Sequence, residues 1–295
     1  MALTKVLIAV KTYPTLSTKY DELVCTAGFL EDGSWVRIYP IPFRKLEYEK
    51  RYSKYDWVEI DLVKNGADFR PESHKPWSID TAFNVVGHID TVNNWQERKN
   101  IVLKKVYTNI TQLIAEAKDK KIATSLATFK PTEILDFTIE EVEREWDKDK
   151  LDTLKAKAQQ LHLFQNAENP FEVVNKLPFK FSYRFKDDEG TISKYMIEDW
   201  EIGALYWNSL KRHEGHDQER KACEDVRKKY WDDFALTKDL YLFLGTIYES
   251  HAKKLSLPIC YRRNISSYIS QASQSRASIK TVLKNSIPPP LMNGL

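Results

Sequence analysis

The sequence has few of the residues that several common kinds of site require. Its three cysteines, Cys25, Cys223 and Cys260, lie far apart and form no Cys-x-x-Cys pair, so neither a disulfide framework nor a zinc knuckle is expected. Only nine glycines occur in 295 residues, and Gly-x-Gly-x-x-Gly, Gly-x-x-x-x-Gly-Lys and Gly-x-Ser-x-Gly are all missing. These absences argue against dinucleotide binding, P-loop nucleotide binding and a serine nucleophile elbow.

Long apolar runs and metal-ligand motifs are also missing. No stretch approaches the roughly 18 apolar residues that span a bilayer, and the apolar run before Pro14 is too short for a signal peptide, so a cytoplasmic protein without membrane contact is expected. His213 and His216 are three residues apart in a charged loop, without the His-Glu-x-x-His spacing of a helical zinc site. They are weak candidates for metal ligands, and we expect no cofactor.

Short strand-like segments follow one another from the N-terminus. Each is apolar, or alternates apolar and polar residues, and each is ended by proline or by polar turn residues. Asp32-Gly33 joins two of them and is a strong hairpin signal. The segments are residues 5–13, 22–30, 34–41, 55–64 and 83–90. This pattern predicts an α+β protein that begins with a small antiparallel β-barrel, OB-like in type, over residues 1–92.

The apolar periodicity changes to helical spacing after this barrel. Residues 93–121 are expected to form one long amphipathic helix, and residues 140–164 a second helix. Between them, residues 125–139 are expected to form a strand that is interrupted at Pro131. Together these elements predict a helical middle region over residues 93–170.

A second β-unit with helices is expected over residues 171–263. It begins with a hairpin strand whose aromatic residues alternate with polar ones and therefore share one face: Phe179, Phe181, Tyr183 and Phe185. This aromatic face is expected to be core. A helix is expected after Asp199 as its N-cap, and strands at 239–249 and 256–262 are expected to pair with the hairpin. Residues 264–295 then form a basic Ser/Pro-rich tail.

Positive charge is concentrated near the C-terminus. The chain carries a formal net charge of +3, but residues 251–295 contain seven basic residues and no acidic one, so the rest of the chain is net negative. A local basic segment is typical of an arm that contacts a polyanion, and equally of a solubilising tail. A third interpretation is that the tail docks onto a protein partner, which would make the chain a protein-interaction module.

Aromatic and basic residues also alternate along residues 34–41. By the period of two, Trp35, Arg37 and Tyr39 share one face of this strand, and Val36 and Ile38 share the other. Bases stack on aromatic rings and phosphates pair with arginine, so the first face predicts binding of single-stranded or distorted nucleic acid. Further basic candidates for this contact are Arg44, Lys45, Arg184, Lys186, Arg262 and Arg263.

A structural interpretation of the same strand remains open. In that interpretation Trp35 packs against the helical middle region, and Arg37 pairs with an acid such as Glu72 or Asp68. A metal-dependent nuclease is a further alternative, because Asp61, Asp68 and Glu72 precede Lys75, and separated acids with a lysine are typical of Mg²⁺-dependent nucleases. The Glu-x-Lys tripeptide that usually accompanies such acids is missing here.

The N-terminal quarter carries a Cys-x-Ala-Gly turn, a Trp-Val-Arg strand and a Pro-Glu pair, formed by Cys25, Ala27, Gly28, Trp35, Val36, Arg37, Pro71 and Glu72. In these features it resembles the poorly characterised prokaryotic proteins that contain a dual OB-type domain, over roughly the first 75 residues. The resemblance implies an OB-like fold and contact with nucleic acid, and it implies no reaction. The expected function is nucleic-acid binding, in a mobile-element or phage-defence setting.

Overall fold

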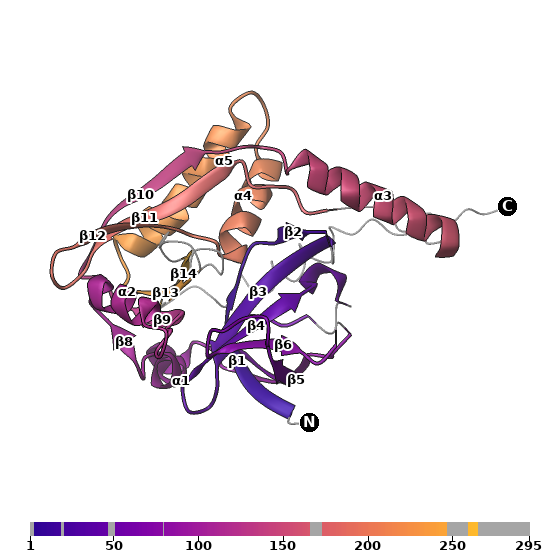
Figure 1. Cartoon of the computed structure of the whole chain (residues 1–295). Coiled ribbons are helices and arrows are strands. Elements are labelled where there is room, and N and C mark those ends of the chain that lie inside the picture. Colours follow the sequence, from indigo (N-terminus) through magenta and orange to yellow (C-terminus); the bar gives the residue numbers. More distant parts are fainter. Residues whose placement is uncertain are drawn as a thin grey trace.

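The computed structural model describes residues 3–18, 21–46, 51–78, 80–165, 173–246 and 259–264. A β-barrel formed by the N-terminal third packs against a second part that contains two smaller sheets and most of the helices (Figure 1). Together the two parts confirm the α+β class. Within the described residues, no helix has the length and apolar character needed to cross a membrane.

Five strands close the barrel. They are β1 (Leu3–Lys11), β3 (Asp21–Phe29), β4 (Trp35–Ile41), β5 (Asp56–Lys64) and β6 (Ser73–Pro76). Their order around the barrel is β1-β3-β4-β6-β5, and β5 returns to pair with β1. All neighbours are antiparallel except β4 and β6. Two short strands extend the sheet, since β2 (Thr15–Ser17) pairs with β3 and β7 (Asn84–His88) pairs with β5.

Alternation along the strands separates the barrel interior from its outer surface. Val36 and Ile38, predicted as core, lie in the interior with Ile8, Val58 and Ile60, all of them at most 2% exposed. A single turn of 3₁₀-helix, η1 (Phe43–Lys45), brings a further aromatic ring to this core. The predicted hairpin turn is present, with φ of 83° at Gly33, a left-handed conformation that favours glycine.

The second part contains two small sheets. Strands β10 (Glu133–Glu141), β11 (Phe179–Lys186) and β12 (Ile192–Met196) form one antiparallel sheet. The other has the order β14-β13-β9-β8, built from β8 (Val106–Tyr107), β9 (Leu126–Phe129), β13 (Leu240–Gly245) and β14 (Ile259–Asn264). The helices are α1 (Val92–Val102), α2 (Ile110–Lys118), α3 (Lys148–Gln165), α4 (Trp200–Arg212) and α5 (Gln218–Arg227), and α5 continues as the π-helix η3 (Lys228–Ala235).

The predicted long helix over residues 93–121 was wrong. Val106 and Tyr107 pair with Thr128 and Phe129 as the short parallel strand β8, which separates α1 from α2. The Asn109 side chain then accepts a hydrogen bond from the backbone N–H of Gln112 and so caps α2. The local helical spacing therefore gives way to sheet pairing that buries the Tyr107 ring.

Two other expectations on the second part have different outcomes. The chain is interrupted at Pro131 as predicted, and it leaves β9 and β10 in two different sheets. The strands near residues 240 and 260 do not pair with the aromatic hairpin, because β13 lies between β9 and β14. The alternating aromatic residues of β11 do face the core, where Phe181, Tyr183 and Phe185 are at most 1% exposed.

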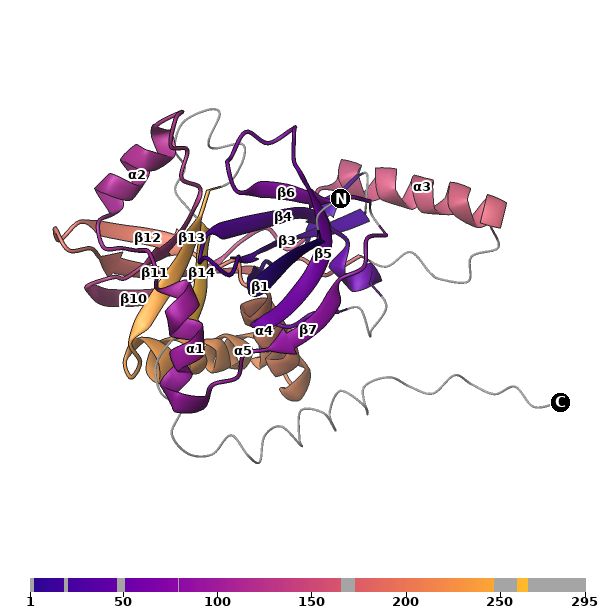
Figure 2. The same cartoon turned by 90° about the horizontal axis from the view of Figure 1, so that it is seen from below.

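The two parts share an apolar interface. Leu7 and Ala9 of β1, with Phe29 of β3, pack against Leu126 of β9 and Phe243 of β13. Figure 2 shows β13 lying between the barrel and the β10-β11-β12 sheet. One outer face of the barrel is thus covered by the second part, which decides which of the outward-facing side chains remain accessible.

Candidate nucleic-acid interface

The strand that carries Trp35, Arg37 and Tyr39 is covered over part of its length. The Trp35 ring is half-buried, with its centroid 3.9 Å from that of Phe29 and 5.3 Å from that of Phe243. Arg37 is only 3% exposed, whereas Tyr39 is 39% exposed. Phe243 and the partners of Arg37 come from the second part. The sequence therefore could not show which of these three outward-facing side chains would be covered.

Arg37 makes its contacts within the protein. Its Nη2 donates to the carbonyl oxygen of Ser125 at 3.0 Å and to the Ser125 hydroxyl at 3.1 Å, and it lies 3.9 Å from Glu72 Oε1. Its Nη1 lies 3.6 Å from the Cys25 sulfur. This is the pairing with Glu72 of the structural interpretation, and it holds the guanidinium away from any external phosphate.

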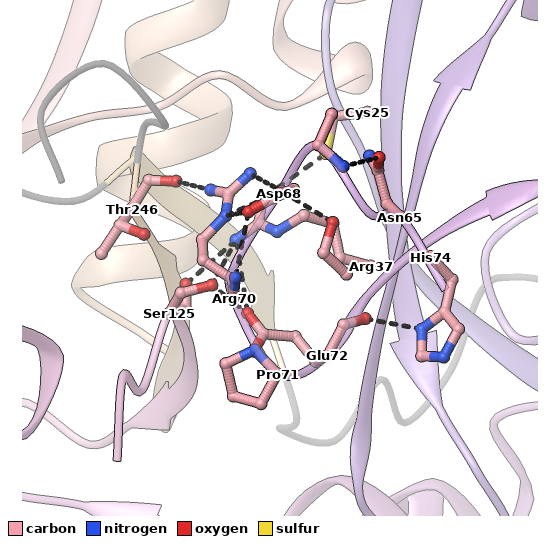
Figure 3. A network of polar contacts seen from close by, with 12 residues as sticks. Cys25, Arg37, Asn65, Asp68, Arg70, Pro71, Glu72, His74, Ser125 and Thr246 are labelled. Carbon is pink, nitrogen blue, oxygen red and sulfur yellow. Dashed lines mark hydrogen bonds and ion pairs between the residues drawn. The ribbon is translucent and has the colours of Figure 1, made fainter. Parts of the chain in front are cut away.

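A polar network fixes the loop between β5 and β6 (Figure 3). Arg70 donates to both carboxylate oxygens of Asp68 through Nε, at 2.8 and 3.0 Å, and Ser73 donates to the same carboxylate at 2.6 Å. Burial acts to raise the pKa of Asp68, but the hydrogen bonds from Arg70 and Ser73 outweigh it, so this pKa lies below its usual value. Arg70 also donates to the carbonyl oxygen of Thr246 at 2.8 Å, which ties the loop to the end of β13.

Three aromatic side chains remain exposed on this loop and on the strands next to it. Tyr39 lies on β4, Phe69 lies in the fixed loop, and Trp77 directly follows β6; Phe69 and Trp77 are each 57% exposed. Arg37 is the register partner of Ser73, so two residues further on Tyr39 and Lys75 face outward on the same side of the sheet. Lys75 is exposed as well. The backbone N–H of Trp77 donates to the carbonyl oxygen of Asp61 at 3.0 Å. We call Tyr39, Phe69, Lys75 and Trp77 the outer aromatic face.

Sequence reasoning missed Phe69 and Trp77. Both lie in residues 68–77, where Pro71 and Pro76 interrupt any strand pattern and favour a connector rich in turns. The signal that was available is the spacing of Lys75 and Trp77, two residues apart, which places a cation and an aromatic ring on one face of an extended segment.

The other basic candidates are spread over the molecule. Arg44 forms an ion pair at 2.8 Å with the buried Glu22, and Lys186 pairs with Glu133 of β10 at 3.1 Å. Arg184 is exposed on the same sheet, where Lys194 also pairs with a β10 carboxylate, that of Glu140. The side chains of Lys45, Arg262 and Arg263 lie outside the described residues, as does the predicted tail over residues 264–295 except for Asn264, which ends β14.

The acidic and histidine candidates do not converge. Asp68 and Glu72 are held by Arg70, Arg37 and Ser125, while Lys75 points outward. In the described ranges of the chain, no three His, Cys, Asp or Glu side chains form a group able to hold a metal ion. His213 Nε2 lies 2.9 Å from Asp225 Oδ2, and His216 is exposed.

A pocket of about 220 Å³ opens beside Trp35, at the junction of the two parts. The barrel contributes the β3–β4 turn and the Pro71-Glu72 segment. The second part contributes Lys105 and Tyr107 at β8, and the segment before and into β9. The lining residues are Phe29, Gly33, Ser34, Trp35, Pro71, Glu72, Lys105, Tyr107, Ile122, Thr124, Ser125 and Leu126.

Comparison with known families divides the chain close to this junction. Residues 2–104 match the family described as Domain of unknown function (DUF8758), and residues 106–275 match Domain of unknown function (DUF8757), which is more than half of the chain. The protein belongs to the DUF8757 family. The pocket and the Arg37 network both join the DUF8758 match to the DUF8757 match. No curated protein matches the chain.

A second polar cluster joins the two matches at the N-terminus of α4. Lys54 forms ion pairs with Asp199 and Glu201, and Lys54 and Asp199 are almost fully buried. Asp199 occupies the predicted N-cap position, but its side chain makes no capping hydrogen bond. Thr12 and Asp199 form an isolated antiparallel β-bridge, and the backbone N–H of Tyr13 donates to the carbonyl oxygen of Glu198 at 2.8 Å. This cluster fastens α4 of the DUF8757 match to the barrel.

Lys11 lies beside this cluster in an aromatic surrounding. Its Nζ is 4.0 Å from the ring centroid of Phe43 and 4.9 Å from that of Trp200, and the residue is 8% exposed. Burial lowers the pKa of Lys11 to about 8, with Lys54 and Arg51 adding to the decrease and the carboxylates of Glu201 and Asp199 opposing it.

Lys11→Met is expected to raise the free energy of unfolding at pH 7 by about 2 kcal/mol. The folded pKa of about 8 lies below the ordinary value of 10.5, so below pH 8 the folded chain holds a charged amine that burial disfavours. This penalty disappears as the pH rises from 8 to 10.5, and the advantage of the variant should shrink over the same range. Urea unfolding at pH 7 and pH 10 measures it, with the exposed Lys211→Met as control. Equal gains at both pH values would contradict the prediction.

Proposed function

We propose that this protein binds single-stranded nucleic acid on the outer aromatic face of its barrel. The observation that carries the proposal is the exposure of Tyr39 and Lys75 on paired strands, together with Trp77 just after β6 and Phe69 on the loop that the Asp68–Arg70 network fixes. Aromatic planes stack with bases of any sequence, and a lysine among them pairs with the backbone phosphates.

The connectivity of the barrel supports the same proposal. Five strands closed in the order β1-β3-β4-β6-β5, with only β4 and β6 parallel, are the arrangement expected if the barrel is of the OB type. In such barrels the second and third strands, and the loop between the fourth and fifth, contact oligonucleotides. Here β4 is the third strand, and the loop that carries Phe69 joins the fourth to the fifth.

Binding is best measured by titrating the whole chain with short fluorescent DNA and RNA single strands at several salt concentrations. Affinity is expected to fall as salt rises, because phosphate contacts release counterions. Lys75→Ala should reduce the slope of log affinity against log salt by about one. The control is Lys211→Ala, which removes an exposed lysine from the last turn of α4. Salt-insensitive binding, or none at low salt, would reject the proposal.

Trp77→Ala is expected to weaken single-strand binding about tenfold, since stacking of one base contributes about 1–3 kcal/mol. Its side chain is 57% exposed, so the fold should be little affected. Leu236→Ala removes a similarly exposed apolar side chain, 62% exposed, from the C-terminal side of η3 and serves as the matched control. Equal affinities for the two variants would show that Trp77 does not stack with the strand.

A further inference from the structure

The pocket beside Trp35 is lined by a carboxylate with one oxygen that accepts no hydrogen bond from the described residues. The Glu72 side chain is 9% exposed, and its Oε1 receives the Ser125 hydroxyl and faces Arg37. For Oε2, the described residues supply no hydrogen-bond donor, and this oxygen is not one of the fully buried polar atoms that lack a partner, so it is open to solvent. It can therefore accept a hydrogen bond from a ligand that displaces water from the pocket.

The charges around the pocket restrict what such a ligand can be. Arg37 already balances the charge of Glu72, so a second cation beside this carboxylate would be left without a counter-charge. Lys105, whose side chain is 73% exposed, stands at the rim with its Nζ 4.7 Å from the Tyr107 ring centroid and 3.9 Å from Glu116 Oε2. A neutral group that donates hydrogen bonds fits the interior, and an anionic group at the rim would pair with Lys105 in competition with Glu116.

The shape and the other lining groups specify the neutral part further. The Trp35 ring is held in place by Phe29 and Phe243 and offers a flat apolar surface. The other polar groups that line the pocket include the hydroxyls of Ser34 and Thr124, both of which can accept hydrogen bonds. A planar ring with adjacent N–H donors on one edge therefore matches the pocket.

We propose that this pocket binds a guanine base, with the nucleotide phosphate near Lys105. Guanine presents a ring N–H and an amino group side by side, which suits Glu72 Oε2 and a neighbouring hydroxyl. Adenine presents an acceptor at the corresponding ring position. The guanine belongs either to a free nucleotide or to a strand on the outer aromatic face, and only the second source rests on the proposed function.

The test measures binding of GMP, AMP and CMP to the whole chain by calorimetry. GMP is expected to bind at least about tenfold more tightly than AMP, the discrimination that a two-point base contact provides. Ile122→Trp, at a rim position 48% exposed, should abolish GMP binding by filling the pocket, whereas Ile192→Trp, at a position 51% exposed on β12, should not. Because Ile122 takes no part in the Arg37–Glu72 network, this variant should keep its fold.

Oligonucleotides with and without guanine then distinguish the two sources. Tighter binding of the guanine-containing strand, lost in Ile122→Trp, supports a base taken from the strand, and GMP preference without strand preference supports a free nucleotide. GMP binding no tighter than AMP binding, or unaffected by Ile122→Trp, would overturn the proposal. If instead the outer aromatic face did not bind nucleic acid, guanine-free strands would not bind, or the Trp77→Ala variant would bind them as tightly as the parent.

Discussion

Arg37→Ala is expected to lower the free energy of unfolding by about 4 kcal/mol. The guanidinium is 3% exposed and supplies hydrogen bonds to two oxygens of Ser125, and it is the cation that faces Glu72. Removal leaves a carboxylate buried without its counter-charge and a cavity between the barrel and β9. The loss should therefore far exceed that of an exposed arginine.

Chemical denaturation of the purified variant measures this effect, with Arg184→Ala as the matched control. Arg184 is exposed on β11, so its removal should change the free energy of unfolding by less than about 0.5 kcal/mol. Adding Glu72→Gln to Arg37→Ala should recover part of the loss, because the unpaired charge is then removed. If Arg37→Ala were as stable as Arg184→Ala, the buried pair would not exist in solution.

Gly28→Ala is expected to destabilise the protein by about 3 kcal/mol, because the pairing of β1 with β3 leaves no room for a methyl group. A Cβ at Gly28 would lie 2.2 Å from the carbonyl oxygen of Leu7 and 2.9 Å from Val6 Cγ1. The first of these contacts is with backbone, so a side-chain rotation cannot relieve it. Gly28 is the register partner of Ile8, and the strain would fall on the closure of the barrel.

Gly66→Ala is the control for this substitution. A Cβ at Gly66 meets nothing within 4 Å, so the variant should match the parent or gain up to about 1 kcal/mol from reduced freedom of the unfolded chain. Thermal unfolding followed by circular dichroism compares the two variants. If the Gly28→Ala and Gly66→Ala variants unfolded at the same temperature, β1 and β3 would have to lie further apart than described.

The strands of the barrel and the aromatic core of β11 were accessible to prediction because a local rule decides them. Val36 and Ile38 alternate with polar or aromatic neighbours, and the same period places Phe181, Tyr183 and Phe185 on one face. The break between α1 and α2 was not accessible in this way. It depends on Val106 and Tyr107 pairing with β9, some 20 residues further along the chain.

The candidate interface shows the same division. The alternation of side chains along a strand places Trp35, Arg37 and Tyr39 on the outer face of the barrel, and the sequence alone was enough to predict this. Only the tertiary structure decided that Ser125, just before β9, covers Arg37 and that Phe243 of β13 covers part of Trp35, while Tyr39 stays exposed. The physical reason is that strand alternation is set by neighbouring residues, whereas burial of an outer face is set by whatever distant segment gains most by packing against it.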